Sequence, residues 1–500
     1  MVFDKFAYER TSFRRSDGSR IVVGKATVKA PYEFEVHPEF PENRAVKLRD
    51  TAHLRMLKAI YRGISRPMVA AWDAYPQGET FSIPRLDFSS DDVVRISKNS
   101  QITHVLRNVV RRRNFSISGD RMQIKHVEGD MDRRAGEFLE MLTEEGRLLT
   151  VGMAEAEPEQ GEVVAVGELG FPSRYAKENG YPLVINAAYF LFEEEDYVSD
   201  FSLFGEAYGM HINQGEILLP PLFERSALLF DWQNQACMRQ VSLTDLVVHC
   251  LGRDWNLGSF TLNEIDRCAV YTRYYGVTAH GRTMGVTPPN PANVDIVIIG
   301  QWIVGYKVGG EVEIPHNGFI LSVPMDLLRE GEFDNRVRYA FASGEKFKSG
   351  IQCGPGLVSN GEIILDETTL RREQFYRKRE MPDGQRDLGV VPTDYASDID
   401  QTRAARTVLG VGYDNELIAL AVEAVNRGME EDEYESSGVT LKELAQLAEE
   451  HNFKHALNVD GGGSTNIQYM FGQLVRGADR RGMPGVFYER MVPSVCVIKS

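Results

Sequence analysis

Apolar residues recur every three or four positions between residues 441 and 451, which predicts an amphipathic helix. Thr440 and Glu443 stand three residues apart at its start, a spacing typical of a capping box. The short apolar run that follows, 456–459, predicts a buried strand. Asp460 therefore stands at the carboxyl end of a strand, where loops diverge and active groups of α/β layers tend to lie.

Strand patterns dominate the chain beyond residue 160. Short apolar runs bounded by turn residues predict strands at 183–187, 215–219, 270–275, 294–299, 302–308, 319–323, 362–365 and 417–422. Towards the N-terminus, 20–24 predicts a strand, while 46–64, 102–112 and 132–142 have helical periodicity. The sequence thus predicts an α+β protein with a strand-rich, mixed-sheet domain that follows a smaller α/β N-terminal domain.

The charge distribution places a boundary between these two parts. Residues 1–150 hold 26 Lys+Arg and 21 Asp+Glu, whereas the rest of the chain holds 30 and 51. A polar stretch with Pro and Gly at 154–161 is the predicted linker, which gives domains at 1–155 and 160–500. The acidity of the second part argues against nucleic-acid binding there. The arginines at 107 and 111–113 fit an anion or nucleic-acid patch, or a solvated helix end.

Composition narrows the classes of function. Five cysteines without a C-x-x-C spacing favour neither zinc nor a disulfide framework, and no apolar run is long enough for a signal peptide or a membrane helix. We therefore expect a cytoplasmic protein without membrane partners, which has scope to form a homo-oligomer. The acidic runs 193–196 and 430–433 fit solvated loops better than a metal site. No metal and no cofactor is expected.

The residues after Asp460 favour an anionic ligand. Gly461, Gly462 and Gly463 follow it directly, and Ser464 and Thr465 add two hydroxyl groups. Consecutive glycines let backbone N–H groups converge and let a ligand approach the main chain. The alternative is a glycine-rich turn without a ligand.

Five stretches occur in an order that resembles the phosphodiester glycosidase family. They are VINAAYF at 184–190, Asn263 with VYTRYYG at 270–276, QCGPGLV at 352–358, ARTVLGV at 405–411 and LNVDGGGST at 457–465. The resemblance covers about residues 160–500 and implies a hydrolase that cleaves the glycosidic bond of a sugar-1-phosphodiester. The implied partner is a small phospho-sugar. Two alternatives stay open: a non-catalytic module that binds such a sugar, and a phosphodiesterase that cleaves P–O.

The resemblance and the residue chemistry together give the candidate site. Asp460 is the first candidate for nucleophile or base, Glu423 the second and His316 the third. The expected substrate-binding residues are Asn186, Gly354, Arg406, Thr407, Gly461, Gly462, Gly463, Ser464 and Thr465. Arg406 suits bidentate binding of a phosphate, with a surface ion pair as the alternative. Asn186 suits a sugar hydroxyl, or the cap of a turn.

Two departures from the family pattern bear on the substrate. Ala187 and Ala188 stand where the family has two glycines, which narrows the space next to Asn186. Glu423 and Ala424 stand in place of an Asp-Gly pair, which moves one carboxylate outward by a methylene.

Overall fold

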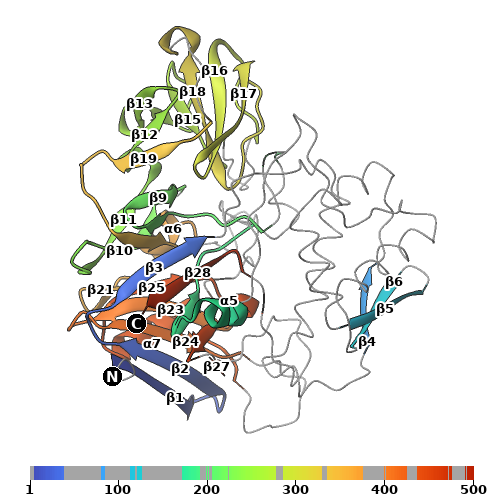
Figure 1. The fold of residues 1–500 in the computed structure, drawn as a ribbon, viewed down its shortest axis with the longest axis vertical. Coiled ribbons are helices and arrows are strands. Elements are labelled where there is room, and N and C mark those ends of the chain that lie inside the picture. The colour runs from blue at the N-terminus through green and yellow to red at the C-terminus, as the bar shows by residue number, and fades with distance from the viewer. Residues whose placement is uncertain are drawn as a thin grey trace, which may run out of the picture.

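The computed structural model describes the parts of the chain drawn as ribbons in Figure 1. They are residues 5–38, 172–191, 199, 201, 205–222, 224–276, 285–328, 335–375, 399, 401–424, 436–470, 472–475, 490 and 492–499, with backbone strands alone at 80–84, 113–118 and 121–126. The helices expected at 46–64, 102–112 and 132–142 and the linker at 154–161 lie outside the described residues.

Two sheets pack face to face around the main hydrophobic core. One is seven-stranded, in the order β1-β2-β24-β23-β25-β21-β22, and the other is five-stranded, in the order β27-β26-β7-β28-β3. Their strands are β1 (Phe6–Arg14), β2 (Arg20–Val28), β3 (Glu33–Pro38), β7 (Leu183–Asn186), β21 (Gly356–Ser359), β22 (Glu362–Ile363), β23 (Arg406–Gly412), β24 (Leu417–Val422), β25 (Phe453–Val459), β26 (Ile467–Tyr469), β27 (Gly472–Gln473) and β28 (Ser494–Lys499). Alternate side chains of both sheets, such as Leu409 and Ile185, meet in this core.

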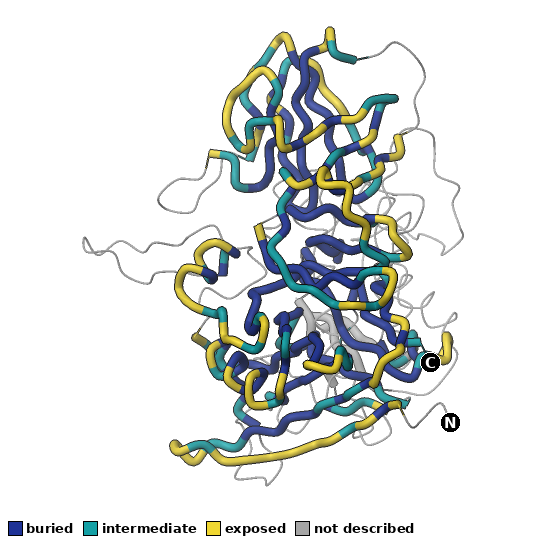
Figure 2. The backbone as a smooth tube through the Cα atoms, turned by 90° about the vertical axis from the view of Figure 1, so that its left-hand side faces the viewer, coloured by how far each residue is buried: buried dark blue, intermediate teal, exposed yellow. Residues whose placement is uncertain are grey.

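One helix covers the outer face of each sheet. α7 (Leu441–Glu450) packs Leu444 and Leu447 against Val408 and Leu420 of the seven-stranded sheet. α5 (Pro172–Asn179) packs Ala176 against Val184 and Val497 of the other sheet. The result is a four-layered α/β/β/α arrangement, in which the layered centre is buried and the edge strand β1 is largely exposed (Figure 2).

The predicted capping box is present. The Thr440 hydroxyl accepts from the Glu443 N–H at 3.1 Å, and the Thr440 N–H donates to Glu443 Oε2 at 2.8 Å. Two orphan N–H groups at the start of α7 are thereby satisfied.

Further sheets lie above this pair in Figure 1. Their strands are β8 (His211–Asn213), β9 (Glu216–Leu219), β10 (Arg225–Phe230), β11 (Ala236–Val241), β12 (Leu246–Cys250), β13 (Arg253–Asn256), β14 (Thr261–Leu262), β15 (Ala269–Tyr271), β16 (Asn290–Ile299), β17 (Trp302–Gly309), β18 (Gly318–Pro324), β19 (Arg338–Phe341) and β20 (Ser349–Gln352). A short helix, α6 (Glu367–Arg372), follows β22, and short 3-10 turns occur at 243–245, 257–259, 325–327 and 462–464. A separate small sheet holds β4 (Thr80–Pro84), β5 (Arg113–Ser118) and β6 (Arg121–His126). The predicted α+β class with strand-rich sheets is confirmed.

The first strands of the chain differ from the predicted division into two domains. β2 pairs with β24, with Val23 opposite Val422, and β3 pairs with β28, with Val36 opposite Cys496. Residues 6–38 are thus part of the same two sheets as the C-terminal strands and not of a separate N-terminal domain. The change in charge marks a change in composition, which does not reveal long-range strand pairing. The boundary at 155–160 itself stays a prediction.

Within the described part of the chain, none of the helices has the length and apolar character that crossing a membrane requires.

Candidate active site

Three strand ends from the two sheets meet at one place. Asp460 follows β25, Arg406 begins β23 next to it, and Asn186 ends β7 in the facing sheet. The Asp460 N–H donates to Ala187 O at 3.0 Å, which joins the two sheets at this point. Side chains that are far apart in sequence are therefore held in one polar site by the ends of buried strands.

Asn186 is the central hydrogen-bonding residue of this junction. Its Nδ2 donates to Asp460 O at 2.6 Å, while its Oδ1 accepts from Thr407 Oγ1 at 3.0 Å and from Asn466 N at 2.9 Å. Its exposure is 0 %, as is that of Thr407. These contacts occupy most of the hydrogen-bonding capacity of the amide, so they favour positioning of the Asp460 loop over direct contact with a sugar.

Asp460 is partly exposed although its surroundings are dense. Burial raises the pKa of its carboxyl group to about 6 from the usual 3.8. The Ser464 hydroxyl, the Arg490 charge, the Gly461 N–H and the Arg406 charge act in the opposite direction, in that order. A carboxyl group with this pKa is mostly ionised at neutral pH yet takes up a proton under mildly acidic conditions.

Each glycine after Asp460 has its own steric reason. A Cβ on Gly461 would lie 2.9 Å from Ala405 O, and Gly462 has a φ of +59°. A Cβ on Gly463 would lie 2.6 Å from Arg490 Cζ, so the guanidinium group rests directly on this glycine. Only glycine allows this combination of close approach and left-handed backbone.

The backbone N–H groups of this turn are largely used within the chain. The donors are Gly461 to Asp460 Oδ1, Gly462 to Ala405 O, Ser464 to Gly461 O and Thr465 to Gly462 O. The expected convergence of N–H groups on an anion therefore does not hold for these four amides, because those of Ser464 and Thr465 bond within the tight 3-10 turn and those of Gly461 and Gly462 bond Asp460 and Ala405. The turn instead sets side chains and cations around Asp460.

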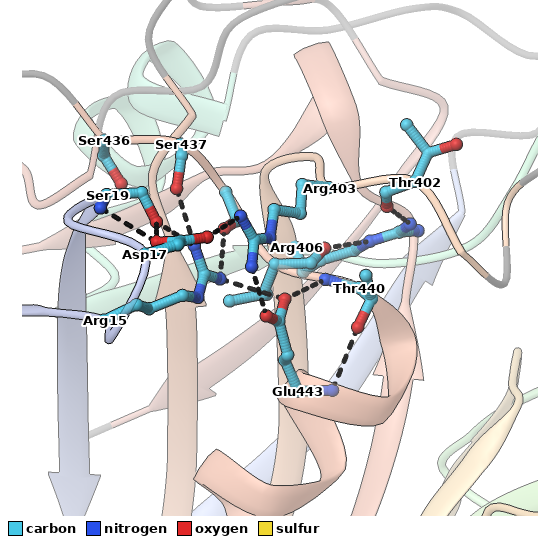
Figure 3. A network of polar contacts seen from close by, with 12 residues as sticks. Arg15, Asp17, Ser19, Thr402, Arg403, Arg406, Ser436, Ser437, Thr440 and Glu443 are labelled. Atoms are coloured by element: carbon cyan, nitrogen blue, oxygen red, sulfur yellow. Dashed lines mark hydrogen bonds and ion pairs between the residues drawn. The ribbon is translucent and has the colours of Figure 1, made fainter.

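Arg406 is buried, and its guanidinium group is tied to the main chain. Nη2 donates to Ile399 O at 2.8 Å and to Thr402 O at 3.0 Å, and Nε donates to Val439 O at 3.4 Å. Figure 3 shows its side chain directed towards Thr402. Its charge still lowers the pKa of Asp460.

An ion network surrounds the segment that leads to Arg406 (Figure 3). Arg403 lies 2.8 Å from Asp17 and 2.9 Å from Glu443, and Arg15 lies 2.9 Å from the same Glu443. Arg15 also donates to Gly438 O at 2.7 Å. The loop between β1 and β2 thereby holds both the start of α7 and the start of β23.

Glu423 is fully buried, and its Oε1 lies 2.9 Å from Nη2 of Arg10. Its carbonyl oxygen accepts from Ser436 Oγ at 2.6 Å. β23 lies between β24 and β25, so with strands about 4.8 Å apart the two carboxylate-bearing strand ends are about 10 Å apart. This placement favours an anchoring role for Glu423 over direct participation beside Asp460.

Gly354 shapes a turn next to β25. Its carbonyl oxygen accepts from Tyr189 OH at 3.1 Å and from Asn458 Nδ2 at 2.9 Å, and it has a φ of +101°. A Cβ here would lie 2.6 Å from Oε2 of Glu373, a fully buried carboxylate whose pKa is raised by burial. Gly354 therefore acts through its backbone.

His316, the third candidate and the one that is not a carboxylate, is buried, and its neighbour Asn317 donates to Glu206 Oε2 at 2.6 Å. Sequence reasoning missed four residues of the junction or its supports: Tyr189, Cys353, Glu373 and Arg490. Tyr189 and Cys353 lie inside the stretches that resemble the family, so the sequence offered a signal for these two residues. No sequence signal pointed to Glu373 or Arg490.

The fold and this junction define a strand-rich α+β protein with a carboxylate site where two sheets end. Residues 306–499 match the model of the phosphodiester glycosidase family. The resemblance is thereby confirmed for residues 306–499, which include Arg406 and Asp460, whereas the stretches at 184–190 and 270–276 lie outside the match. No curated protein is significantly similar to the chain.

The chain is also similar to solved structures with which it shares little sequence. A hypothetical protein from Synechocystis is 14 % identical with a TM-score of 0.36, over 98 % of this chain and 79 % of that one. A putative exported protein from Burkholderia pseudomallei is 12 % identical with a TM-score of 0.41, over 99 % and 97 %. The catalytic domain of zebrafish N-acetylglucosamine-1-phosphodiester alpha-N-acetylglucosaminidase, auto-inhibited by its pro-peptide, is 9 % identical with a TM-score of 0.36, over 99 % and 83 %.

Proposed function

We propose that the chain is a hydrolase that cleaves the glycosidic bond of a sugar-1-phosphodiester. The observation that carries this proposal is the state of Asp460: a partly exposed carboxyl group with a pKa of about 6, on which two arginine charges act. The match to the phosphodiester glycosidase family supports the reaction class.

The chemistry of the bond suits a single reactive carboxylate. Cleavage between the sugar and the phosphate passes through an oxocarbenium-like state, which a carboxylate stabilises as nucleophile or as the base that activates water. A phosphodiester is a good leaving group, so strong help from a general acid is dispensable. Asp460 takes the role of nucleophile or base, and the nearby guanidinium groups of Arg406 and Arg490 offset the negative charge of the leaving phosphate.

The supporting residues keep Asp460 in place. Asn186 holds its carbonyl oxygen, and Thr407 in turn holds Asn186. Removal of the Asn186 amide would free the loop after β25 and leave buried partners unsatisfied.

Hydrolysis in ¹⁸O-labelled water tests the proposal directly. Incubation with a sugar-1-phosphodiester should place the label in the released sugar, because water attacks carbon. Label in the phosphate would replace the proposal with P–O cleavage by a phosphodiesterase. Tight binding of the phosphodiester without turnover would identify a non-catalytic sugar-phosphate module.

A further inference from the structure

Two arginines act on Asp460, and they differ in how far they are buried. Nε and Nη2 of Arg406 donate to the carbonyl oxygens of Ile399, Thr402 and Val439. Arg406 has only 4 % of its surface exposed. These contacts fix the segments that lead into β23 and into α7, so Arg406 has the surroundings of a structural cation.

Arg490 lies on the glycine turn itself. A Cβ added to Gly463 would lie 2.6 Å from both Cζ and Nη2 of Arg490 and 2.9 Å from its Nε. The guanidinium group therefore rests on the bare backbone of the middle of the turn, and Arg490 stays partly exposed. Its charge lowers the pKa of Asp460 more than that of Arg406 does.

We propose that Arg490, and not Arg406, binds the phosphate group of the ligand, with Gly463 as the residue that gives it room. This inference rests on the proposed function and assigns the anion-binding residue of that site. A planar guanidinium group has the fork geometry that phosphate oxygens match, and this one lies partly exposed on the turn that follows the reactive carboxylate. Arg406 becomes a positioning residue that holds the strand start beside Gly461.

The assignment gives Gly463 a definite role. The atoms that a Cβ at this position would meet belong to the end of a flexible side chain, so alanine displaces the guanidinium group without forcing the backbone to move. Gly463→Ala thus perturbs the anion-binding group while every charge is retained. Arg490→Gln removes the charge and keeps the side chain polar.

The test is calorimetric titration of the full chain with inorganic phosphate and with a methyl sugar-1-phosphodiester. Arg490→Gln and Gly463→Ala should each weaken binding of both by about tenfold to a hundredfold, the usual effect of a lost charge-assisted hydrogen bond. The free sugar should be affected far less. Arg336→Gln is the matched control, because it removes an exposed arginine paired with Glu216 at 3.0 Å and should leave both affinities unchanged.

Two results would overturn the assignment: phosphate affinity within twofold of wild type in Arg490→Gln, or no binding of either anion by the wild type. Circular dichroism melts of each variant separate loss of binding from loss of fold. Turnover is measured separately. Anion binding through Arg490 without hydrolysis supports the assignment and refutes the proposed reaction. Hydrolysis with an unchanged KM in Arg490→Gln supports the reaction and refutes the assignment.

Discussion

Asp460 combines three properties of a reactive carboxylate. It stands at a strand end, and it is partly exposed. Burial raises its pKa, and the charges of the two nearby arginines lower it. Burial disfavours the ionised form, and the cations and hydrogen bonds only partly offset this cost. The residue is therefore maintained in a state that costs the folded protein some stability at neutral pH.

Replacement of Asp460 by asparagine should abolish turnover and stabilise the fold in neutral solution. The folded-state pKa is raised from 3.8 to about 6, so the stability linked to this group is present below pH 4 and lost as the pH rises through 6. At pH 8 the variant should gain on the order of 1–3 kcal/mol in the free energy of unfolding, and at pH 4 much less. Urea unfolding at both pH values together with kcat checks this. A variant that retains near wild-type kcat would make Asp460 structural.

The pH dependence of the wild type should report the same group. A carboxylate that acts as nucleophile or base must be ionised, so kcat/KM should rise with pH and level off above a midpoint near 6. Arg490 lowers this pKa, so in Arg490→Gln the midpoint should move to higher pH. Rate profiles of both proteins between pH 4 and 8 provide the measurement. A rate that falls through pH 6 would instead make Asp460 a general acid.

For single residues, the sequence predicted the chemical type present at the site better than it predicted the contacts of each side chain. The carboxylate at a strand end could be predicted because a local apolar run precedes it. The steric reason for each glycine could not be predicted, because Gly461 contacts the β23 segment and Gly463 contacts Arg490, both distant in sequence. The expected roles of Asn186 and Arg406 as ligand-binding residues stay predictions, although the contacts described above join them to the protein's own backbone and to Thr407.

Secondary-structure elements are joined near the site by the ion network of Arg15, Asp17, Arg403 and Glu443 (Figure 3). Glu443 has two roles: it accepts hydrogen bonds from both arginines, and it caps α7 by accepting from the Thr440 N–H. Burial raises the pKa of Glu443, but the hydrogen bonds from Arg403 and the Thr440 N–H and the charge of Arg15 more than offset this, so its pKa lies below the usual 4.5.

Glu443→Gln should therefore destabilise the fold by about 1–3 kcal/mol, because two partly buried arginines lose their shared acceptor. The lowered pKa means that this stabilisation is present above pH 4.5 and is lost as the pH falls. Glu367→Gln is the control, since its pair with Arg371 on α6 is exposed and should contribute less than about 0.5 kcal/mol. Chemical denaturation at pH 7 gives both values. Equal effects for the two variants would show that the network is no stronger than a surface pair.

Elements were predictable where their signals were local. β24 (Leu417–Val422) coincides with its predicted range, because its apolar run is bounded by turn residues on both sides. The capping box of α7 was visible for the same reason. The link from Arg15 to Glu443 spans 428 positions and leaves no periodic trace in the sequence. Likewise, β1 has a mostly exposed burial pattern, so its bounds could not be predicted within residues 1–45, which have the character of strands and loops.

At the scale of the whole molecule, the main difference from expectation is that residues 6–38 lie in the same sheets as the C-terminal strands. β1 and β2 complete one edge of the seven-stranded sheet, and β3 forms an edge of the five-stranded sheet. Val36 and Phe34 of β3 are fully buried in the core. Backbone pairing, apolar burial and specific ion pairs such as Arg10–Glu423 join these strands to the rest.

Deletion of residues 1–38 should accordingly prevent the chain from folding. The deletion exposes the edge of β24 and leaves Glu423 without Arg10. It also opens the core where Phe34 packs on Phe230, with their ring centroids 4.5 Å apart. A chain that lacks only residues 1–4 keeps β1–β3 and serves as the control. Soluble yield, gel filtration and thermal melts are the measurements. A truncated chain that is monomeric and melts cooperatively at the full-length temperature would show that β1–β3 are dispensable to both sheets.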